Sequence, residues 1–401
     1  MYCAFFVLFY ISKIIIKIFY YAILANKLIF RKIETRFMDY KPTESRVELN
    51  KRKKQHHPWK WFFIILALVV AGVGIYGFSI YNKTRNAINK TYDPSNAVTQ
   101  DNFNGKNSFN ILLMGTDTGA FGRHEKRGNS DTMILATVNP KKNKITLMSI
   151  PRDTMAQMIG TDSFQVQKIN AAYNIGGARM AMRTTSKVLN VPIKYYMVMN
   201  MGGMQKIVDG VGGVDVKVPL TFSYGGYTFT KGKTMHLNGS QALAYSRMRY
   251  DDPQGDYGRQ MRQRQVIMSI LKHAFSLKTI QNLDSVLDST SNSVRTNLTF
   301  DSMVAIAKNY RHCTDNMKSD YLHGAGAMIG GASYQVMSDK ELQRVSNIVR
   351  KEMGLGDVDL DNNETYQNSK NPDFNWSSGD PNQIYYIYKP DSDSLWEGDD
   401  D

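Results

Sequence analysis

Cysteine is almost absent from this chain of 401 residues, which contains only Cys3 and Cys313. Because Cys3 lies in a leader that translation from Met38 would omit, we expect no structural disulfide, and the spacing of the two cysteines offers no metal site. Internal repeats are absent as well. A hydrophobic content of 42% is typical of a globular protein with a substantial core. We therefore expect one large domain or two small ones.

Acidic residues are scarce in one part of the chain and basic residues in another, although the formal net charge is +14. Arg31 to Lys60 holds ten Lys and Arg against four acidic residues, whereas Gly356 to Asp401 holds twelve acidic residues against two lysines. The overall charge thus describes no single surface, and it does not predict a nucleic-acid partner.

A long uncharged run, WFFIILALVVAGVGIYGFSI, occupies Trp61 to Ile80. A helix of these 20 residues would be about 30 Å long, the thickness of a bilayer core. The basic stretch KRKKQHHPWK precedes it, and such clusters stay on the cytoplasmic side. Because no small-residue cleavage site is visible, we expect an uncleaved single-pass anchor with the rest of the chain outside the cell membrane. The alternative is a buried core helix.

The remaining organisation follows from changes in composition along the chain. Residues 1–37 are either a second apolar segment or untranslated, if initiation occurs at Met38. The acidic end of the chain is expected to be disordered, although IYYIYK within it could pack. The expected parts are a cytoplasmic leader (1–60), a transmembrane helix (61–81), a stalk (82–106), an extracytoplasmic catalytic domain (107–355) and an acidic tail (356–401).

Three apolar runs predict strands, at Phe109–Asp117, Thr132–Val138 and Lys144–Ile150. The last two flank NPKKN, a hairpin signal. Helical patterns follow, including one with a Gly-Gly interruption. Strands that alternate with helices, together with a hairpin, predict an α/β fold with a mixed central sheet flanked by helices.

The hairpin has a consequence for two charged residues. Antiparallel neighbours bring the start of one strand beside the end of the next, so Asp131 should lie near Arg152. If the strand that ends at Asp117 runs parallel to the strand before Arg152, then Asp117 joins them at the same sheet edge. Two carboxylates and a guanidinium would then converge.

The most charged run after the basic leader is SRMRYDDPQGDYGRQMRQRQ, from Ser246 to Gln265. A helix that begins at Asp256 places Asp256, Arg259, Gln260 and Gln263 on the face that continues as an apolar stripe, while Arg262 and Arg264 point elsewhere. A buried arginine needs a partner, which is either an anionic ligand or an internal salt bridge. Arg247 and Arg249, two apart on an extended segment, would point to the same side.

Six fragments in this order carry a family resemblance: NILLMGTD, RGNSDTMILATVNP, SIPRDT, KINAAYNIGG, GVGGVDV and LNGSQALAYSRMRYDDPQGDYGRQMRQRQVI. The chain resembles the LytR-CpsA-Psr family of Gram-positive cell-wall enzymes over roughly Phe109 to Met353. The resemblance implies a phosphotransferase in the cell membrane. It would move a teichoic acid, capsular or other wall polysaccharide from a polyprenyl-pyrophosphate carrier to the C6 hydroxyl of N-acetylmuramic acid in peptidoglycan, with Mg²⁺ as cofactor.

The same resemblance implies a set of site residues. Asp117 and Asp131 match the magnesium-associated aspartates. Arg152, Arg247 and Asp256 are the catalytic candidates, with Asp256 either a general base or an orienting group for an arginine. An arginine often stands two residues before the aspartate of SDT in the family, and here Asn129 takes that position. The pyrophosphate-binding set is Arg127, Arg152, Lys168, Arg247, Arg249, Arg259 and Gln263.

Three other functions stay open at this point. A membrane-anchored transcriptional regulator or attenuator would use the basic leader, but no helix-turn-helix pattern accompanies that leader. A non-catalytic scaffold would bind lipid-linked intermediates without turnover. A pyrophosphatase would release the lipid phosphate to water instead of transferring the glycan.

Overall fold

The computed structural model describes residues 58–117, 127–274 and 293–390. The chain divides into two compact units, Met1–Arg85 and Asn86–Asp401. Helix α2, Pro58–Thr91, contains the uncharged run that we expect to form an anchor. Among the described residues, no helix meets the joint requirement of length and apolarity for crossing a membrane. The expected leader up to residue 57 lies outside the described residues, and the anchor stays a prediction.

A six-stranded mixed sheet forms the centre of the second unit, in the order β11-β6-β1-β2-β3-β12. Strands β1 and β3 both pair antiparallel with β2, so they run parallel to each other, as the predicted convergence requires. Strands β6 and β12 add in parallel on either side, next to β1 and β3. The strands are β1 (Phe109–Thr116), β2 (Ser130–Asn139), β3 (Lys144–Ser149), β6 (Tyr195–Asn200), β11 (Val294–Thr296) and β12 (Asn316–Tyr321).

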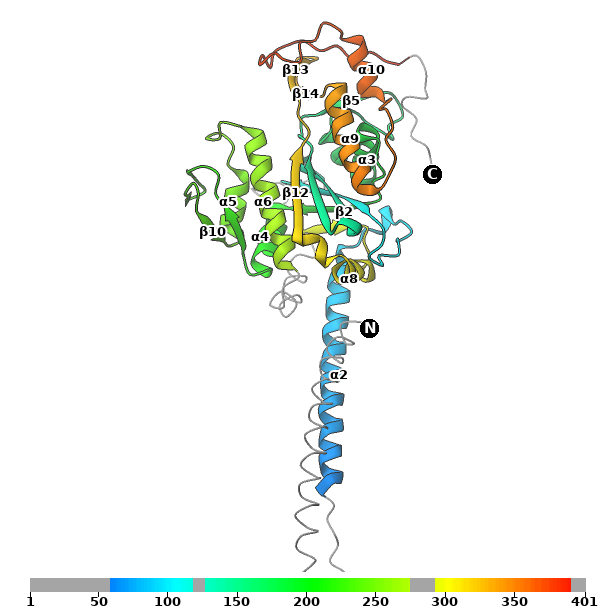
Figure 1. The fold of residues 1–401 in the computed structure, drawn as a ribbon, viewed down its shortest axis with the longest axis vertical. Helices are drawn as coiled ribbons and strands as arrows, with labels where there is room; N and C mark the ends of the chain where they lie inside the picture. Colours follow the sequence, from blue (N-terminus) through cyan, green and yellow to red (C-terminus); the bar gives the residue numbers. More distant parts are fainter. Residues whose placement is uncertain (1–57, 118–126, 275–292, 391–401) are drawn as a thin grey trace, which may run out of the picture. The chain divides into compact units, whose positions relative to one another are not determined.

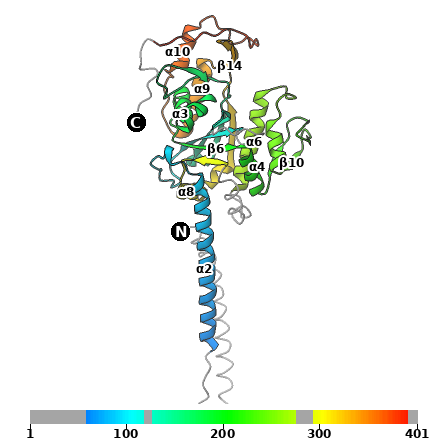
Figure 2. The same ribbon diagram turned by 180° about the vertical axis from the view of Figure 1, so that it is seen from behind.

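Helices cover both faces of this sheet, as Figures 1 and 2 show. Side chains alternate between the faces, so the fully buried Ile134 and Leu135 of β2 enter different cores. Leu135 packs with α3 (Ala171–Leu189) and α9 (Asp339–Met353). Ile134 packs with α6 (Asp256–Ala274), α8 (Phe300–Asn309) and the 3-10 turn η3 (Arg311–Asp315). The predicted fold class is confirmed for this domain. The predicted Gly-Gly interruption also appears, because Gly177 bends α3 with a φ of 70°.

A small lobe packs on the outer side of α6. Its apolar core joins Phe229 and Tyr245 to Val266 and Ile270 of α6. Helix α6 is therefore enclosed between the sheet and this lobe, so it buries more than the single face that its apolar pattern indicates. The lobe contains α4 (Met201–Gly210), β7 (Val214–Lys217), β8 (Phe222–Tyr224), β9 (Tyr227–Phe229), β10 (Thr234–Leu237) and α5 (Gly239–Arg247).

The segment expected to be a stalk differs from that expectation. Helix α2 continues to Thr91, and the 3-10 turn η1, Pro94–Asn96, follows. Phe103 is 3% exposed, and its ring lies 5.0 Å from that of Phe109. Asp93 accepts a hydrogen bond of 2.7 Å from the Tyr196 hydroxyl. Residues 92–106 thus belong to the domain, because their few apolar side chains have core partners.

The segment expected to be a disordered acidic tail is ordered as far as residue 390. Helix α10, Asn363–Lys370, begins with a capping box at Asn362. The aromatic rings of Phe374 and Tyr385 are buried against the hairpin of β13 (Ala325–Ile329) and β14 (Ala332–Val336). Aromatic burial therefore orders a segment that its composition alone would leave disordered. Residues 391–401 lie outside the described residues.

Candidate functional site

The carboxyl ends of β1 and β3 meet the start of β2 at one edge of the sheet. Gly115 pairs with Thr132 and Thr116 with Ser130, which leaves Asp131 as an extra residue in a β-bulge. Such bulges re-aim a side chain, and they are frequent beside functional sites. The Asp131 Oδ1 atom lies 3.1 Å from Arg152 Nη1, directly after β3. The contact predicted from hairpin geometry is therefore present.

The first turn of α6 lies against the same edge. Arg259 Nη2 is 2.6 Å from Asp256 Oδ1 and 3.5 Å from the main-chain oxygen of Asp131. The other Asp256 oxygen accepts a hydrogen bond of 2.8 Å from Gln260 Nε2. Both carboxylate oxygens of Asp256 are thus engaged within α6, and they hold the Arg259 guanidinium toward the sheet edge.

The electrostatics of this edge favour an anion. Burial lowers the pKa of Arg259; the Asp256 carboxylate opposes that effect, while the nearby Arg152 guanidinium reinforces it. Burial alone would also lower the pKa of Arg152, but Asp131 and Asp153 raise it overall. The Nε atom of Arg259 is buried without a hydrogen-bond partner in the part of the chain that the structure describes. A buried donor without a partner requires an explanation, and a bound anion supplies one.

Two further polar residues join the cluster from β5, Val166–Lys168, and the turn after it. β5 pairs with β4, Met155–Gln157, which follows Arg152 by two residues. Lys168 Nζ lies 2.9 Å from Asp153 Oδ1, and Asn170 Nδ2 lies 3.5 Å from Asp131 Oδ1. The predicted Lys168 and Arg152 therefore share Asp153 as an ion-pair partner.

The arginines before α6 are placed differently from the expectation. Arg247 is the last residue of α5, so it does not belong to an extended segment. Met248 between them is 1% exposed, whereas Arg247 and Arg249 are each partly exposed, and their pointing to the same side stays a prediction. The Arg249 guanidinium is near enough to help lower the pKa of Arg259.

Arg262, which we expect off the face that carries Arg259, is buried against the small lobe, with a side chain 0% exposed. It forms an ion pair with Asp252 and donates hydrogen bonds to the main-chain oxygens of Met248 and, at 3.1 Å, Tyr245. Its guanidinium also lies 5.3 Å from the centre of the Phe222 ring. Arg262 therefore anchors the loop that carries Arg247 and Arg249, a role that our prediction from the sequence missed.

Arg264, which we also expect off the face that carries Arg259, is 4% exposed. It donates a hydrogen bond of 2.6 Å to Ser149 Oγ at the end of β3, and it lies 5.5 Å from the Tyr321 ring. Burial lowers its pKa to about 10. The small lobe on one side of α6 and the sheet on the other enclose both arginines, which an isolated helical wheel cannot reveal.

The remaining predicted residues lie around this cluster. Asp117 directly follows β1 and is partly exposed, and Gln263 lies one turn beyond Arg259 on α6. Arg127 is exposed and neighbours α3, with Nη1 about 3.0 Å from where a Cβ of Gly177 would stand. The structure thus brings Asp131, Arg152 and Arg259 together, with Lys168 and Arg249 beside them, and places Arg127 toward α3.

The oxygen donors at this edge fit a hard divalent cation. No group of three His, Cys, Asp or Glu residues with metal-binding geometry occurs within the described ranges. Mg²⁺ does not need one, since it usually takes one or two carboxylates together with substrate phosphates and water. Asp117 and Asp131, at the adjacent ends of β1 and β2, are suitable candidates for those carboxylates.

Comparison with known proteins supports the same family. The LytR_cpsA_psr family model matches residues 75–351. A polyisoprenyl-teichoic acid–peptidoglycan teichoic acid transferase of Enterococcus faecalis is 44% identical over 294 residues, which cover 73% of this chain and 95% of the relative.

Solved structures agree. One from Enterococcus faecalis, described as a transcriptional regulator, matches with a TM-score of 0.60 and 34% identity, covering 70% of this chain and all of the other. TagT bound to LIIa-WTA matches with a TM-score of 0.54 and 25% identity, covering 65% and 96%. The family model spans well over half of the chain, and the Enterococcus relative is matched almost end to end, so this protein belongs to the LytR_cpsA_psr family.

Proposed function

We propose that this protein transfers a glycopolymer from a polyprenyl-pyrophosphate carrier to the C6 hydroxyl of N-acetylmuramic acid in peptidoglycan. The observation that carries the proposal is Arg259, whose side chain is 12% exposed and whose buried Nε donor has no partner among the described residues, beside Arg152. Relatives named for teichoic acid transfer to peptidoglycan support it.

The chemistry follows from the charges. The acceptor hydroxyl releases its proton to water, its oxygen attacks the phosphorus next to the glycan, the bond from that phosphorus to the bridging oxygen breaks, and polyprenyl phosphate leaves with the electron pair. Negative charge builds up on the leaving phosphate. Arg152 and Arg259 are held by ion pairs to Asp131 and Asp256 before substrate arrives, so they can stabilise that charge without rearrangement. Their planar forks suit phosphate oxygens.

Asp256 acts in this proposal as a positioning residue rather than as the general base. Its Oδ1 atom forms an ion pair of 2.6 Å with Arg259, and its Oδ2 atom accepts a hydrogen bond of 2.8 Å from Gln260. A general base needs a free oxygen within hydrogen-bond reach of the acceptor hydroxyl. The geometry therefore favours a role in holding Arg259.

Mg²⁺ would be held by Asp117 and Asp131 together with phosphate oxygens of the substrate. When bound, it would supply further neutralisation of the pyrophosphate charge. Asp131 also holds Arg152, so the same carboxylate would set the spacing between the cation site and the guanidinium. We further propose that α2 anchors the protein in the cell membrane, where the lipid carrier is found.

The test uses the full chain with a defined lipid-linked donor, Mg²⁺ and peptidoglycan fragments, and mass spectrometry of the products. We expect a fragment that carries the glycan through a phosphodiester, together with polyprenyl phosphate. Polyprenyl phosphate with a free glycan phosphate would instead identify a pyrophosphatase. Unchanged donor would identify a binding scaffold.

A regulatory function is a second candidate, because a solved relative is described as a transcriptional regulator. Protease added to intact protoplasts discriminates between the two. A transferase domain outside the membrane should be cleaved, whereas a DNA-binding domain must stay protected inside the cell.

A further inference from the structure

An extended segment near the end of the described chain presents three large side chains to solvent. Ile384, Tyr386 and Tyr388 are 63%, 60% and 41% exposed, whereas Tyr385 between them is 1% exposed. Alternate residues of an extended chain share one face, so these three form a single surface, which we call the C-terminal platform. It lies beyond residue 351, where the match to the family model ends.

Buried amide side chains hold the platform in place. Asn371 donates to the main-chain oxygen of Tyr386 and accepts from its nitrogen, both at 2.9 Å. Gln367 of α10 makes the same pair of bonds to Tyr388, at 2.6 and 2.8 Å. These bonds replace the neighbouring strand that the segment lacks on this side. The main chain at both tyrosines is therefore held in place, so binding would order little further backbone, which is one property of a preorganised site.

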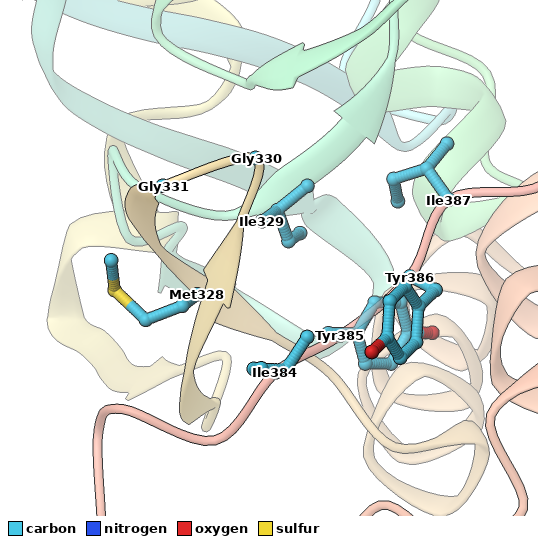
Figure 3. A pocket seen from close by; sticks show the side chains of 8 residues that line it. All are labelled: Met328, Ile329, Gly330, Gly331, Ile384, Tyr385, Tyr386 and Ile387. Atoms are coloured by element: carbon cyan, nitrogen blue, oxygen red, sulfur yellow. The ribbon is translucent and has the colours of Figure 1, made fainter.

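Two grooves meet at the platform. One of about 610 Å³ lies between the turn of the β13–β14 hairpin and Ile384 to Ile387, as Figure 3 shows. The second, of about 380 Å³, shares Ile384 and Tyr386 with the first. Volumes of this size are typical of ligand sites. The other residues that line the second groove are Lys370, Asn371, Pro372, Asp373, Phe374, Gln383 and Tyr388.

The chemistry of these grooves selects a class of ligand. Aromatic faces flanked by amide, carboxylate and ammonium groups suit sugar rings, which have apolar faces and a rim of hydroxyls. A polyanion gains little there, because Lys370, the one lysine among the residues that line the grooves, is matched by Asp373. A bilayer surface fits poorly for the same reason. An uncharged run of sugar rings therefore matches the platform better than a phosphate-rich polymer does.

The β13–β14 hairpin connects the grooves to the candidate active site. At its base, Gln335 donates its main-chain N–H to the oxygen of Asp153 at 2.8 Å, and its Oε1 atom lies 3.2 Å from the Tyr257 hydroxyl. Asp153 and Tyr257 directly follow Arg152 and Asp256 in the sequence. At its tip, Gly331 lines the larger groove. Four residue steps along a strand span about 13 Å, which a chain of a few sugars can bridge.

We propose that the C-terminal platform binds the glycan strand of the acceptor peptidoglycan, a few sugars away from the hydroxyl that reacts. This inference rests on the proposed transfer to peptidoglycan. It assigns to residues 384–388 the selection of a long acceptor strand over a short fragment.

The test compares the full chain with a Tyr386→Ala/Tyr388→Ala variant. Binding is measured by co-sedimentation with sacculi from which attached polymers have been removed. We expect binding about tenfold weaker in the double variant, because truncation of well-placed tyrosines removes much of a contact. Transfer to a disaccharide acceptor should be unchanged, since that acceptor does not reach the platform. Val358→Ala, which lies before α10 and outside both groove linings and is 44% exposed, is the control and should bind normally.

The outcomes separate this inference from the proposed function. Equal sedimentation of the double variant, with transfer intact, would overturn the platform and leave the transferase. Binding of a free teichoic acid that depends on the two tyrosines would assign the platform to the donor polymer and so overturn the acceptor assignment. No transfer by the unmodified chain would overturn the function itself. If the double variant does not fold, hydrogen exchange of residues 383–388 in the unmodified protein decides, because soluble glycan fragments should slow it, and no change would refute the inference.

Discussion

Arg262 and Asp252 form an ion pair that is almost entirely removed from solvent, with side chains 0% and 3% exposed. The pair joins α6 to the loop before it, and Arg262 also binds two main-chain oxygens at the end of α5. A Cβ on Gly258 would overlap the Asp252 carboxylate, so only glycine fits beside the pair. The pair therefore fixes the segment that carries Arg247 and Arg249, although it does not itself belong to the cluster at the sheet edge.

We predict that Arg262→Met lowers the free energy of unfolding by about 3–5 kcal/mol, because it leaves the Asp252 charge buried without its partner. The measurement is chemical denaturation of the full chain. Addition of Asp252→Asn should recover part of this loss, since asparagine can still accept from the Gln254 main chain. A double variant as unstable as the single one would show that the pair itself contributes little.

Arg259 should be required for transfer but not for folding. Arg259→Lys keeps the charge and loses the planar fork, so we expect the rate of transfer to fall about 10²–10³-fold. Unfolding should change little, because the Asp256 side chain left behind is 26% exposed and can be hydrated. Lys318→Ala, on the exposed surface of β12, is the control and should transfer normally. A fully active Arg259→Lys variant would remove the bidentate contact from the mechanism.

Asp256→Asn distinguishes a positioning residue from a general base. Asparagine still offers an oxygen to Arg259, so we expect transfer to fall only about tenfold and its pH profile to keep its shape. The measurement is the rate of transfer across a pH series. Loss of the ascending limb of that profile, with a much larger drop in rate, would instead make Asp256 the base.

The sequence predicts those parts of the site that depend on local geometry. The Asp131–Arg152 contact follows from a hairpin, and the Asp256–Arg259 pair follows from helical spacing. The burial of Arg262 depends on the small lobe, which packs onto α6 from another part of the chain. A helical wheel of α6 alone carries no information about that contact. The ordered structure of residues 356–390 was also not predicted. The acidic composition of this segment favours disorder, and it contains no sign of the hydrogen bonds from the Asn371 side chain that hold the main chain of Tyr386.

Glu364 on α10 should make the stability of the domain depend on pH in the opposite sense to a carboxylate whose pKa is lowered, such as Glu352. It is fully buried, and burial raises its pKa above the usual value; its Oε1 atom accepts a hydrogen bond of 3.1 Å from the Gln157 main chain. A glutamate with a raised folded pKa gives its full stability below the unfolded pKa and loses it as pH rises through the folded pKa. The neutral form is thus the one that the fold prefers.

Glu364→Gln keeps an acceptor oxygen for the Gln157 N–H and cannot ionise. We therefore predict that this variant is more stable than the unmodified chain at neutral pH, and that the difference shrinks toward pH 4 as Glu364 itself becomes protonated. Thermal unfolding across that range measures it. The control is Glu352→Gln. In the unmodified chain Lys144 and Lys142, 2.7 and 3.3 Å from the Glu352 carboxylate, lower its pKa despite burial, and glutamine would lose these ion pairs. This control should be less stable at neutral pH. A Glu364→Gln variant that is destabilised at neutral pH would mean that α10 depends on the ionised carboxylate.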